Sequence, residues 1–218
     1  MNVLVACEFS GIVRDAFLKK GHYAVSCDLL PTESKLTSDW NMDKMHVQGD
    51  VLEIIDDNWD LIVAHPPCQY ICNSGVRWLY TEEGRWKKMV EGARFFAALL
   101  NADCPRIAVE NPVMHGYGMR VIKEIVPPSV LDALKMQTIQ PYEFGHPESK
   151  RTQLWLKGLP KMTPTRVLSR PDDGWENQTP SGQNKLGPSK DRWKQRATTY
   201  KGIAKAMATQ WLQEGTQK

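Results

Sequence analysis

Short apolar segments alternate with segments of helical periodicity along most of this chain. Residues 2–6 form an apolar, β-branched run bounded by turn-forming residues, which is typical of a buried strand. The apolar positions of residues 12–17 then recur at helical spacing, and Gly21 stands where a helix cap is expected. Further strands are predicted at residues 23–27, 61–64, 106–109 and 154–156. This alternation predicts an α/β fold with a mostly parallel, doubly wound sheet.

One long helix is predicted over residues 82–100. Its apolar positions recur at intervals of three and four residues: Trp86, Met89, Val90, Ala93, Phe96, Ala97 and Leu100. The spacing therefore assigns Trp86 to the core. A second helix is expected near residues 119–125, and Ser10 is expected to cap the helix that follows the first strand.

Polar or reactive side chains follow the predicted strands. They are Glu8, Asp28, Asp50, Cys68 and Glu110. Ligands of doubly wound sheets bind outside the carboxyl ends of the parallel strands, so these side chains indicate a site at that edge. The plain alternative for Asp28 and Asp50 is that they cap turns, and for Glu110 that it caps a helix.

Length and composition favour a single globular domain without a membrane segment. The chain has 218 residues, of which 41% are hydrophobic and 24% charged. No apolar run approaches membrane-spanning length, so we expect a cytoplasmic protein. The five cysteines fit no zinc spacing and are odd in number, which predicts reduced thiols with neither a disulfide framework nor a metal site.

The segment most informative about chemistry is residues 60–75. It places Cys68 just beyond a buried strand, in a turn whose backbone is fixed by Pro66 and Pro67. A thiol held at the ligand-binding edge of a sheet can act as a nucleophile, whereas most cysteines behave as small hydrophobic residues. His65 adjoins this turn, and His146 adjoins a later polar segment; without a metal pattern we interpret both as turn residues or as supports for the site.

The run from Pro66 to Gln69 resembles the Pro-Pro-Cys-Gln catalytic motif of cytosine-C5 methyltransferases, which use S-adenosylmethionine. Residues 110–112, Glu-Asn-Pro, resemble the family's Glu-Asn-Val motif, and residues 8–11 resemble its cofactor loop. Residues 145–155 are similar to its late Gly-x-Pro-Gln segment, and residues 202–208 to its closing helix. The motifs occur in the family's order, which implies a Rossmann-like methyltransferase fold. The resemblance is to compact phage-type members and implies the host cytoplasm as the location.

The resemblance also implies roles for individual residues. The Cys68 thiolate would add to cytosine C6, and Glu110, held protonated in a partly desolvated pocket, would hydrogen-bond N3. Lys150 or Arg151 would contact the carbonyl oxygen of the base or a phosphate. The residues implied for binding S-adenosylmethionine are Glu8, Phe9, Ser10, Gly11, Asp28, Leu29, Asp50, Val51 and Pro67. Free backbone amides are expected in the turn after the first strand.

A short basic segment occupies the place of the family's target-recognition domain. Between Lys161 and Lys201 there are nine Lys or Arg residues against four Asp or Glu residues. The sequence accordingly divides into a catalytic core (1–157), a recognition-like region (158–201) and a closing helix (202–218). The residues expected to contact nucleic acid are Gln69, Asn73, Ser74, Lys190, Arg192, Lys194 and Arg196. The alternative for the basic segment is a solvated surface loop.

Some positions depart from the family pattern. Val13 and Arg14 replace glycines of the cofactor loop, which predicts weaker cofactor affinity. The Asn expected before the last helix is absent, and Thr198 and Thr199 are the nearest polar residues. The first expectation is methylation of cytosine in DNA. The same chemistry on RNA or a free cytosine nucleotide, and a catalytically silent binding protein, remain as alternatives.

Overall fold

The computed structural model describes residues 1–35 and 45–211, which form a seven-stranded sheet of order β3-β2-β1-β4-β5-β7-β6. The strands are β1 (Asn2–Ala6), β2 (Tyr23–Asp28), β3 (His46–Gln48), β4 (Leu61–Ala64), β5 (Ile107–Asn111), β6 (Lys135–Ile139) and β7 (Thr152–Lys157). Strands β1 to β5 pair in parallel, and β7 is antiparallel to both of its neighbours. The predicted α/β, Rossmann-like fold with a mostly parallel sheet is confirmed.

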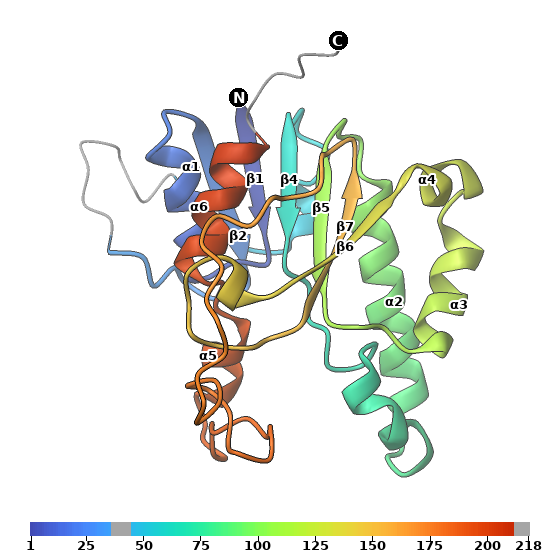
Figure 1. Cartoon of the computed structure of the whole chain (residues 1–218). Coiled ribbons are helices and arrows are strands. Elements are labelled where there is room, and N and C mark those ends of the chain that lie inside the picture. Colours follow the sequence, from blue (N-terminus) through green and yellow to red (C-terminus); the bar gives the residue numbers. More distant parts are fainter. Residues whose placement is uncertain (36–44, 212–218) are drawn as a thin grey trace.

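Helices cover both faces of this sheet. Helices α1 and α6 lie together on one face, and α2 and α3 on the other (Figure 1). The helices are α1 (Ile12–Leu18), α2 (Arg85–Asn101), α3 (Gly116–Ile125), α4 (Pro128–Ala133), α5 (Arg192–Ala197) and α6 (Lys201–Gln210). Three 3-10 segments are η2 (Val51–Glu53), η3 (Asn73–Tyr80) and η4 (Pro141–Glu143).

The continuous apolar strands reflect this double coverage. Side chains alternate between the faces of a strand, so Val3 and Val5 belong to the layer with Phe17 of α1, whereas Leu4 belongs to the layer with Phe96 of α2. All five of these side chains are buried. A sheet that is buried on both sides needs apolar residues at every position, so its central strands form continuous apolar runs in the sequence.

Two local expectations are wrong. Helix α1 is not capped by Ser10, because Gly11 is its N-cap, with a φ of 70° that favours glycine. Trp86 is not a core residue: 40% of it is exposed. It lies in the first turn of α2, where it packs edge-on against Tyr80 and Tyr117.

The proposed recognition-like region carries one short helix, α5, among turns. The predicted closing helix corresponds to α6, which packs beside α1; residues 212–218 lie outside the described part of the chain. None of the helices within residues 1–35 and 45–211 combines the length and apolar character needed to cross a bilayer.

Candidate active site

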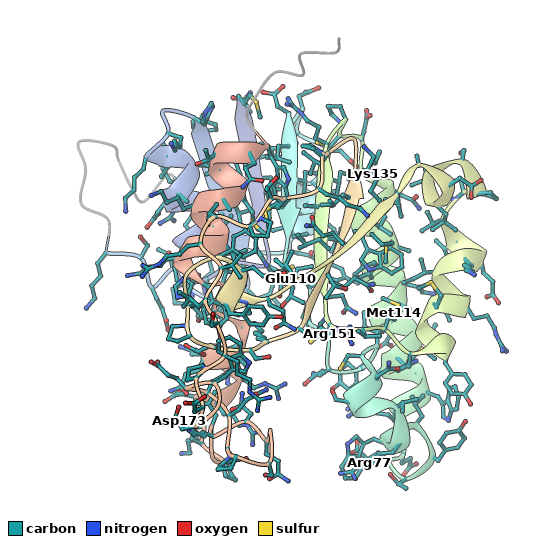
Figure 2. The ribbon with its side chains drawn as sticks, in the orientation of Figure 1. Arg77, Glu110, Met114, Lys135, Arg151 and Asp173 are labelled. Carbon is teal, nitrogen blue, oxygen red and sulfur yellow. The ribbon has the colours of Figure 1, made fainter. Side chains whose placement is uncertain are left out.

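The carboxyl ends of β4 and β5 bring the two main catalytic candidates to one edge of the sheet. These strands are parallel neighbours, with Ala64 in register with Val109. Glu110 is therefore at the level of His65, and Cys68 follows in the turn that leaves β4. Figure 2 shows Glu110 between the helices of the two faces of the sheet, with Arg151 close by in this view.

His65 and Glu110 form a buried ion pair. His65 Nδ1 donates a hydrogen bond to Glu110 Oε2 over 2.6 Å, and only 7% and 16% of their side chains are exposed. Burial alone would raise the pKa of Glu110, but the hydrogen bond from His65 and the charges of Lys150 and His65 lower it to about 2. Burial alone would lower the pKa of His65, but its hydrogen bond to Glu110 and the charges of Glu110 and Glu8 raise it.

This pair corrects the expectation that Glu110 is held protonated. Desolvation of a carboxyl group favours its neutral form, but a charged partner within hydrogen-bonding distance favours the carboxylate more strongly here. The contact therefore favours the form in which His65 carries the proton and Glu110 is a carboxylate. Sequence reasoning placed His65 beside the site without a partner, because the contact joins residues 45 positions apart.

Cys68 shares the site with a second thiol. Its backbone carbonyl accepts hydrogen bonds from the amides of Ile71 and Cys72, at 3.1 and 3.0 Å. This tight turn returns the chain toward Cys68, and the two thiols are hydrogen-bonded. That bond, followed by burial, raises the pKa of Cys68. The same bond, with a further one from Ser74, lowers the pKa of Cys72 to about 5.

Lys150 is a cation that acts on these groups and lines a cavity together with Glu110. Its charge acts on Cys68, His65 and Glu110, and its Nζ donates to the backbone carbonyl of Arg196 over 2.6 Å. A cavity of about 10 Å³ beside it is lined by residues that include Glu110, Thr199 and Tyr200. Arg151 is exposed. Of the two cations proposed from the sequence, Lys150 therefore acts electrostatically on the site.

A larger cavity, of about 260 Å³, lies at the ends of β1 and β2. It is lined by Cys7, Cys27, Asp28, Leu29, Gly49, Asp50, Val51, Pro67 and Phe95. The sequence singled out five of these, Asp28, Leu29, Asp50, Val51 and Pro67, for cofactor binding. It missed Phe95, which falls outside the apolar positions that the helical spacing assigned to this helix, and it missed Cys7, whose positive φ of 57° marks the turn after β1.

The two carboxylates of this cavity cap turns and retain acceptor capacity. Asp28 Oδ1 accepts from the amide of Leu30 at 2.9 Å, and Asp50 Oδ1 accepts from the amide of Leu52 at 3.0 Å. Within the described residues, the second carboxylate oxygen of each has no hydrogen-bond partner. The turn-capping role and a ligand-binding role are therefore compatible. Burial, followed by the charge of Asp28, raises the pKa of Cys7, so this thiol is neutral.

The turn after β1 differs from the expected cofactor loop. Glu8 is buried, and its carboxylate accepts from the amides of Val13 and Arg14, at 2.6 and 3.1 Å. Ser10 Oγ accepts from the amide of Ile12 at 3.3 Å. Side chains of the loop therefore occupy the first amides of α1, whereas the amides of Phe9, Ser10 and Gly11 have no hydrogen-bond partner within the described residues.

Arg14 takes the space that a glycine would leave open. It is fully buried, pairs with Asp15 at 2.7 Å and donates to Ser26 Oγ at 3.1 Å. A Cβ on Gly11 would lie 2.7 Å from its guanidinium. Phe9 is buried and packs 5.9 Å from the ring of Trp193. The cavity lining contains none of residues 8–11, so their contact with a cofactor stays a prediction.

The residues expected to contact nucleic acid lie on two extensions beyond this edge of the sheet. Gln69, Asn73 and Ser74 are exposed in the turn and start of η3 on one side, and α5 lies on the other (Figure 1). In Figure 2, Arg77 is labelled on one of these extensions and Asp173 on the other.

The four basic residues around α5 differ in their surroundings. Lys190 and Arg196 are exposed, and Arg192 is half-buried. Lys194 forms an ion pair with Glu33 at 2.6 Å, so its charge is partly neutralised. Among the residues that the structure describes, no three His, Cys, Asp or Glu side chains are grouped to hold a metal ion.

Comparisons with known proteins give structural likeness only. No protein-family model matches the chain, and no curated protein matches it in sequence. A solved protein described as a DNA modification methyltransferase encoded within an E. coli prophage is 15% identical, with a TM-score of 0.48 over 78% of this chain and 52% of that protein. The Entamoeba histolytica methyltransferase EhMeth is 18% identical, with a TM-score of 0.43 over 77% and 57%. The S. pombe Dnmt2 methyltransferase is 16% identical, with a TM-score of 0.42 over 74% and 51%. This chain thus spans about half the length of the solved methyltransferases that it resembles.

Proposed function

We propose that this chain transfers a methyl group from S-adenosylmethionine to C5 of cytosine in DNA, with Cys68 as the nucleophile, as a compact member of the cytosine-C5 methyltransferase family. The observation that carries the proposal is that Pro67 and Cys68 are consecutive residues. Pro67 lines the 260 Å³ cavity, and the charges of Glu110 and Lys150 act on Cys68. A cofactor in the cavity and a base beside Glu110 would therefore meet at Cys68.

The cavity suits the nucleoside part of the cofactor. Its volume is close to the lower end of the range of about 300–1,000 Å³ for small-molecule sites. Asp28 and Asp50 each offer a free carboxylate oxygen to a ribose hydroxyl or an adenine amine, and Val51 and Phe95 offer apolar contact to a flat ring. Bound there, S-adenosylmethionine would supply an electrophilic methyl group.

The protein's own residues would activate the base. Cytosine C5 is a poor nucleophile, and addition of the Cys68 sulfur to C6 places electron density on C5. C5 then bonds to the methyl group, loses its proton to a base, and the C6–S bond breaks as the ring becomes aromatic again. Glu110 would hold N3 while negative charge develops on the ring. Lys150 would stabilise the thiolate and the carbonyl oxygen.

The extensions on either side of the site favour a nucleic acid as the substrate. A cytosine in a duplex must leave the stack to reach Cys68, and contacts to phosphates hold the strand while it does so. Lys190 and Arg196 are exposed cations on one extension, and Gln69 and Asn73 are exposed on the other. Because α5 is the only helix described within residues 158–201, sequence readout should be short or lax.

The test is methyl transfer from radiolabelled S-adenosylmethionine to duplex DNA, single-stranded DNA, RNA and dCMP in parallel. We expect incorporation into DNA at C5, its loss in Cys68→Ser, and its retention in Cys104→Ser. Cys104 is a suitable control because it is buried before β5, at the opposite edge of the sheet, where a hydroxyl can keep its hydrogen bonds. Transfer to RNA or dCMP alone would assign the same chemistry to another substrate. Incorporation into none of the four would refute the proposal.

A further inference from the structure

His65 lies between two buried carboxylates at the edge of the sheet. Its Nδ1 bonds to Glu110 of β5 at 2.6 Å, and Glu8, from the turn after β1, acts on it electrostatically. Lys150, from the segment before β7, is the cation that opposes them. His65 Nε2 is buried and has no hydrogen-bond partner in the described part of the chain. The ring is thus fixed in orientation, with one nitrogen committed to Glu110.

The pair raises a question about proton supply. Under the proposed function, Glu110 must give a proton to N3 of the base, or share one with it, as the Cys68 sulfur adds to C6. A carboxylate can only accept hydrogen bonds. Since the free structure keeps Glu110 ionised, the proton has to reach it from a neighbour, and His65 holds one at 2.6 Å.

We propose that His65 is a positioning residue that stores the catalytic proton and passes it to Glu110 when cytosine binds. This inference rests on the proposed function. The Nδ1–H bond of His65 breaks and an O–H bond forms on Glu110, which leaves the imidazole neutral. Glu110 then passes the proton to N3 while the Cys68 sulfur bonds to C6 and its S–H proton passes to the Cys72 thiolate, the more acidic partner of the thiol pair. The net charge is unchanged: His65 loses one positive charge, and the Cys72 thiolate loses one negative charge. The proton returns by the same route when the C6–S bond breaks.

The proposal has a definite pH signature. The active form holds one proton on the His65–Glu110 pair, so activity of the wild type should fall as pH rises through the pKa of His65. In His65→Gln, Glu110 must carry the proton alone, with only Lys150 left to lower its pKa against burial; its ordinary pKa of 4.5 is below the 6.5 of a histidine, which is raised further in the wild type. The high-pH limit of activity should therefore move to lower pH. The ratio of variant to wild-type kcat/KM should fall about tenfold per pH unit between the two limits and then level off.

The experiment measures kcat/KM of both proteins between pH 5 and pH 9.5, with whichever of the four cytosine substrates the wild type methylates best. His22→Gln is the matched control, because His22 is a histidine beside the N-terminal amine, at the opposite end of the sheet strands. Its ratio to the wild type should not change with pH. Histidine-labelled NMR gives a readout without catalysis: the His65 signal should titrate above its usual range in the wild type and at lower pH in Glu110→Gln.

The outcomes separate the two proposals. A ratio that falls with pH, together with a lowered His65 titration in Glu110→Gln, supports the proton store. An active wild type with a ratio that is flat across the pH range would show that His65 is only structural and would overturn the inference alone. A wild type that methylates none of the four substrates would overturn the proposed function, and this inference with it. If His65→Gln does not fold, the NMR titrations of the wild type and Glu110→Gln decide: an unshifted His65 signal overturns the proposal.

Discussion

His65 Nδ1 and Glu110 Oε2 lie 2.6 Å apart because their strands, β4 and β5, are parallel neighbours in matching register. Parallel pairing brings consecutive carboxyl ends to the same edge, so two residues that follow buried strands meet there. The contact fixes Glu110 as a carboxylate beside Cys68. It also ties the protonation of the site to the stability of the fold.

The pair should stabilise the protein most between about pH 4.5 and pH 6.5. Glu110 contributes stability above its usual pKa of 4.5, and this is lost as pH falls toward its folded pKa of about 2. His65 contributes stability below its usual pKa of 6.5, and this is lost as pH rises through its raised pKa. Urea unfolding of the wild type, His65→Gln, Glu110→Gln and the double variant measures the coupling.

At pH 5.5, Glu110→Gln should lower the free energy of unfolding by about 3 kcal/mol, since it removes one partner of a buried pair. The double variant should lose less than the sum of the single variants. The coupling should shrink at pH 3 and at pH 9. A coupling energy of the same size at all three pH values would contradict the ion pair.

The cavity beside β2 should bind S-adenosylmethionine through Asp28. We predict that Asp28→Ala weakens binding about tenfold or more, because a hydrogen bond to a charged group contributes about 1.5–3 kcal/mol. Asp57→Ala is the matched control, since Asp57 is exposed and outside the cavity lining. Isothermal titration calorimetry on both variants gives the comparison. Equal dissociation constants would remove Asp28 from the binding site.

The thiol pair predicts that Cys72 controls the ionisation of Cys68. In Cys72→Ala the hydrogen-bond partner that raises the Cys68 pKa is gone. The pH midpoint for alkylation of Cys68 by iodoacetamide should fall by about one unit or more. Mass spectrometry of the Cys68 peptide follows the reaction, with Cys104→Ala for comparison. An unchanged midpoint would mean that the two thiols ionise independently.

Several strands could be predicted from the sequence because of where they lie. The bounds of β1 and β4 match their apolar runs, since both are central and buried on both faces. Strand β3 has only three residues, and three of the five residues of β6 are polar. Both are edge strands with a single neighbour, so their formation depends on β2 and β7 and leaves little signal in the local sequence.

The site was predictable in part for a similar reason. Asp28, Asp50, Cys68 and Glu110 follow strand signals, and topology alone brings them to one edge. The His65–Glu110 pair and the capping of α1 by Glu8 depend on side-chain packing across the fold, which no periodicity records. Trp86 follows the helical spacing but lies in the first turn of α2, beyond the sheet, where partly exposed aromatic rings are its neighbours.

Exposed cations around α5 should contribute phosphate contacts. The variant Lys190→Gln/Arg196→Gln should weaken binding to DNA of any sequence and reduce the slope of log K against log salt by about 1.8, or about 0.9 per lost contact. Lys19→Gln/Lys20→Gln removes the same charge after α1, at the opposite edge of the sheet. Fluorescence anisotropy with labelled duplexes at several salt concentrations measures both. Identical slopes for the two double variants would identify residues 190–196 as a solvated surface.

The most direct measurement is a covalent trap. The protein is incubated with S-adenosylmethionine and an oligonucleotide that contains 5-fluorocytosine, then digested and analysed by mass spectrometry. C5 of this base carries fluorine in place of the hydrogen that must leave as a proton. After methyl transfer the C6–S bond therefore cannot break, and the base should stay bound to the enzyme through sulfur. We predict a methylated fluorocytosine adduct on the peptide that contains Cys68, and its absence in Cys68→Ser. An adduct on Cys72, or no adduct in an enzyme that methylates the matching cytosine oligonucleotide, would contradict the assignment of Cys68 as the nucleophile.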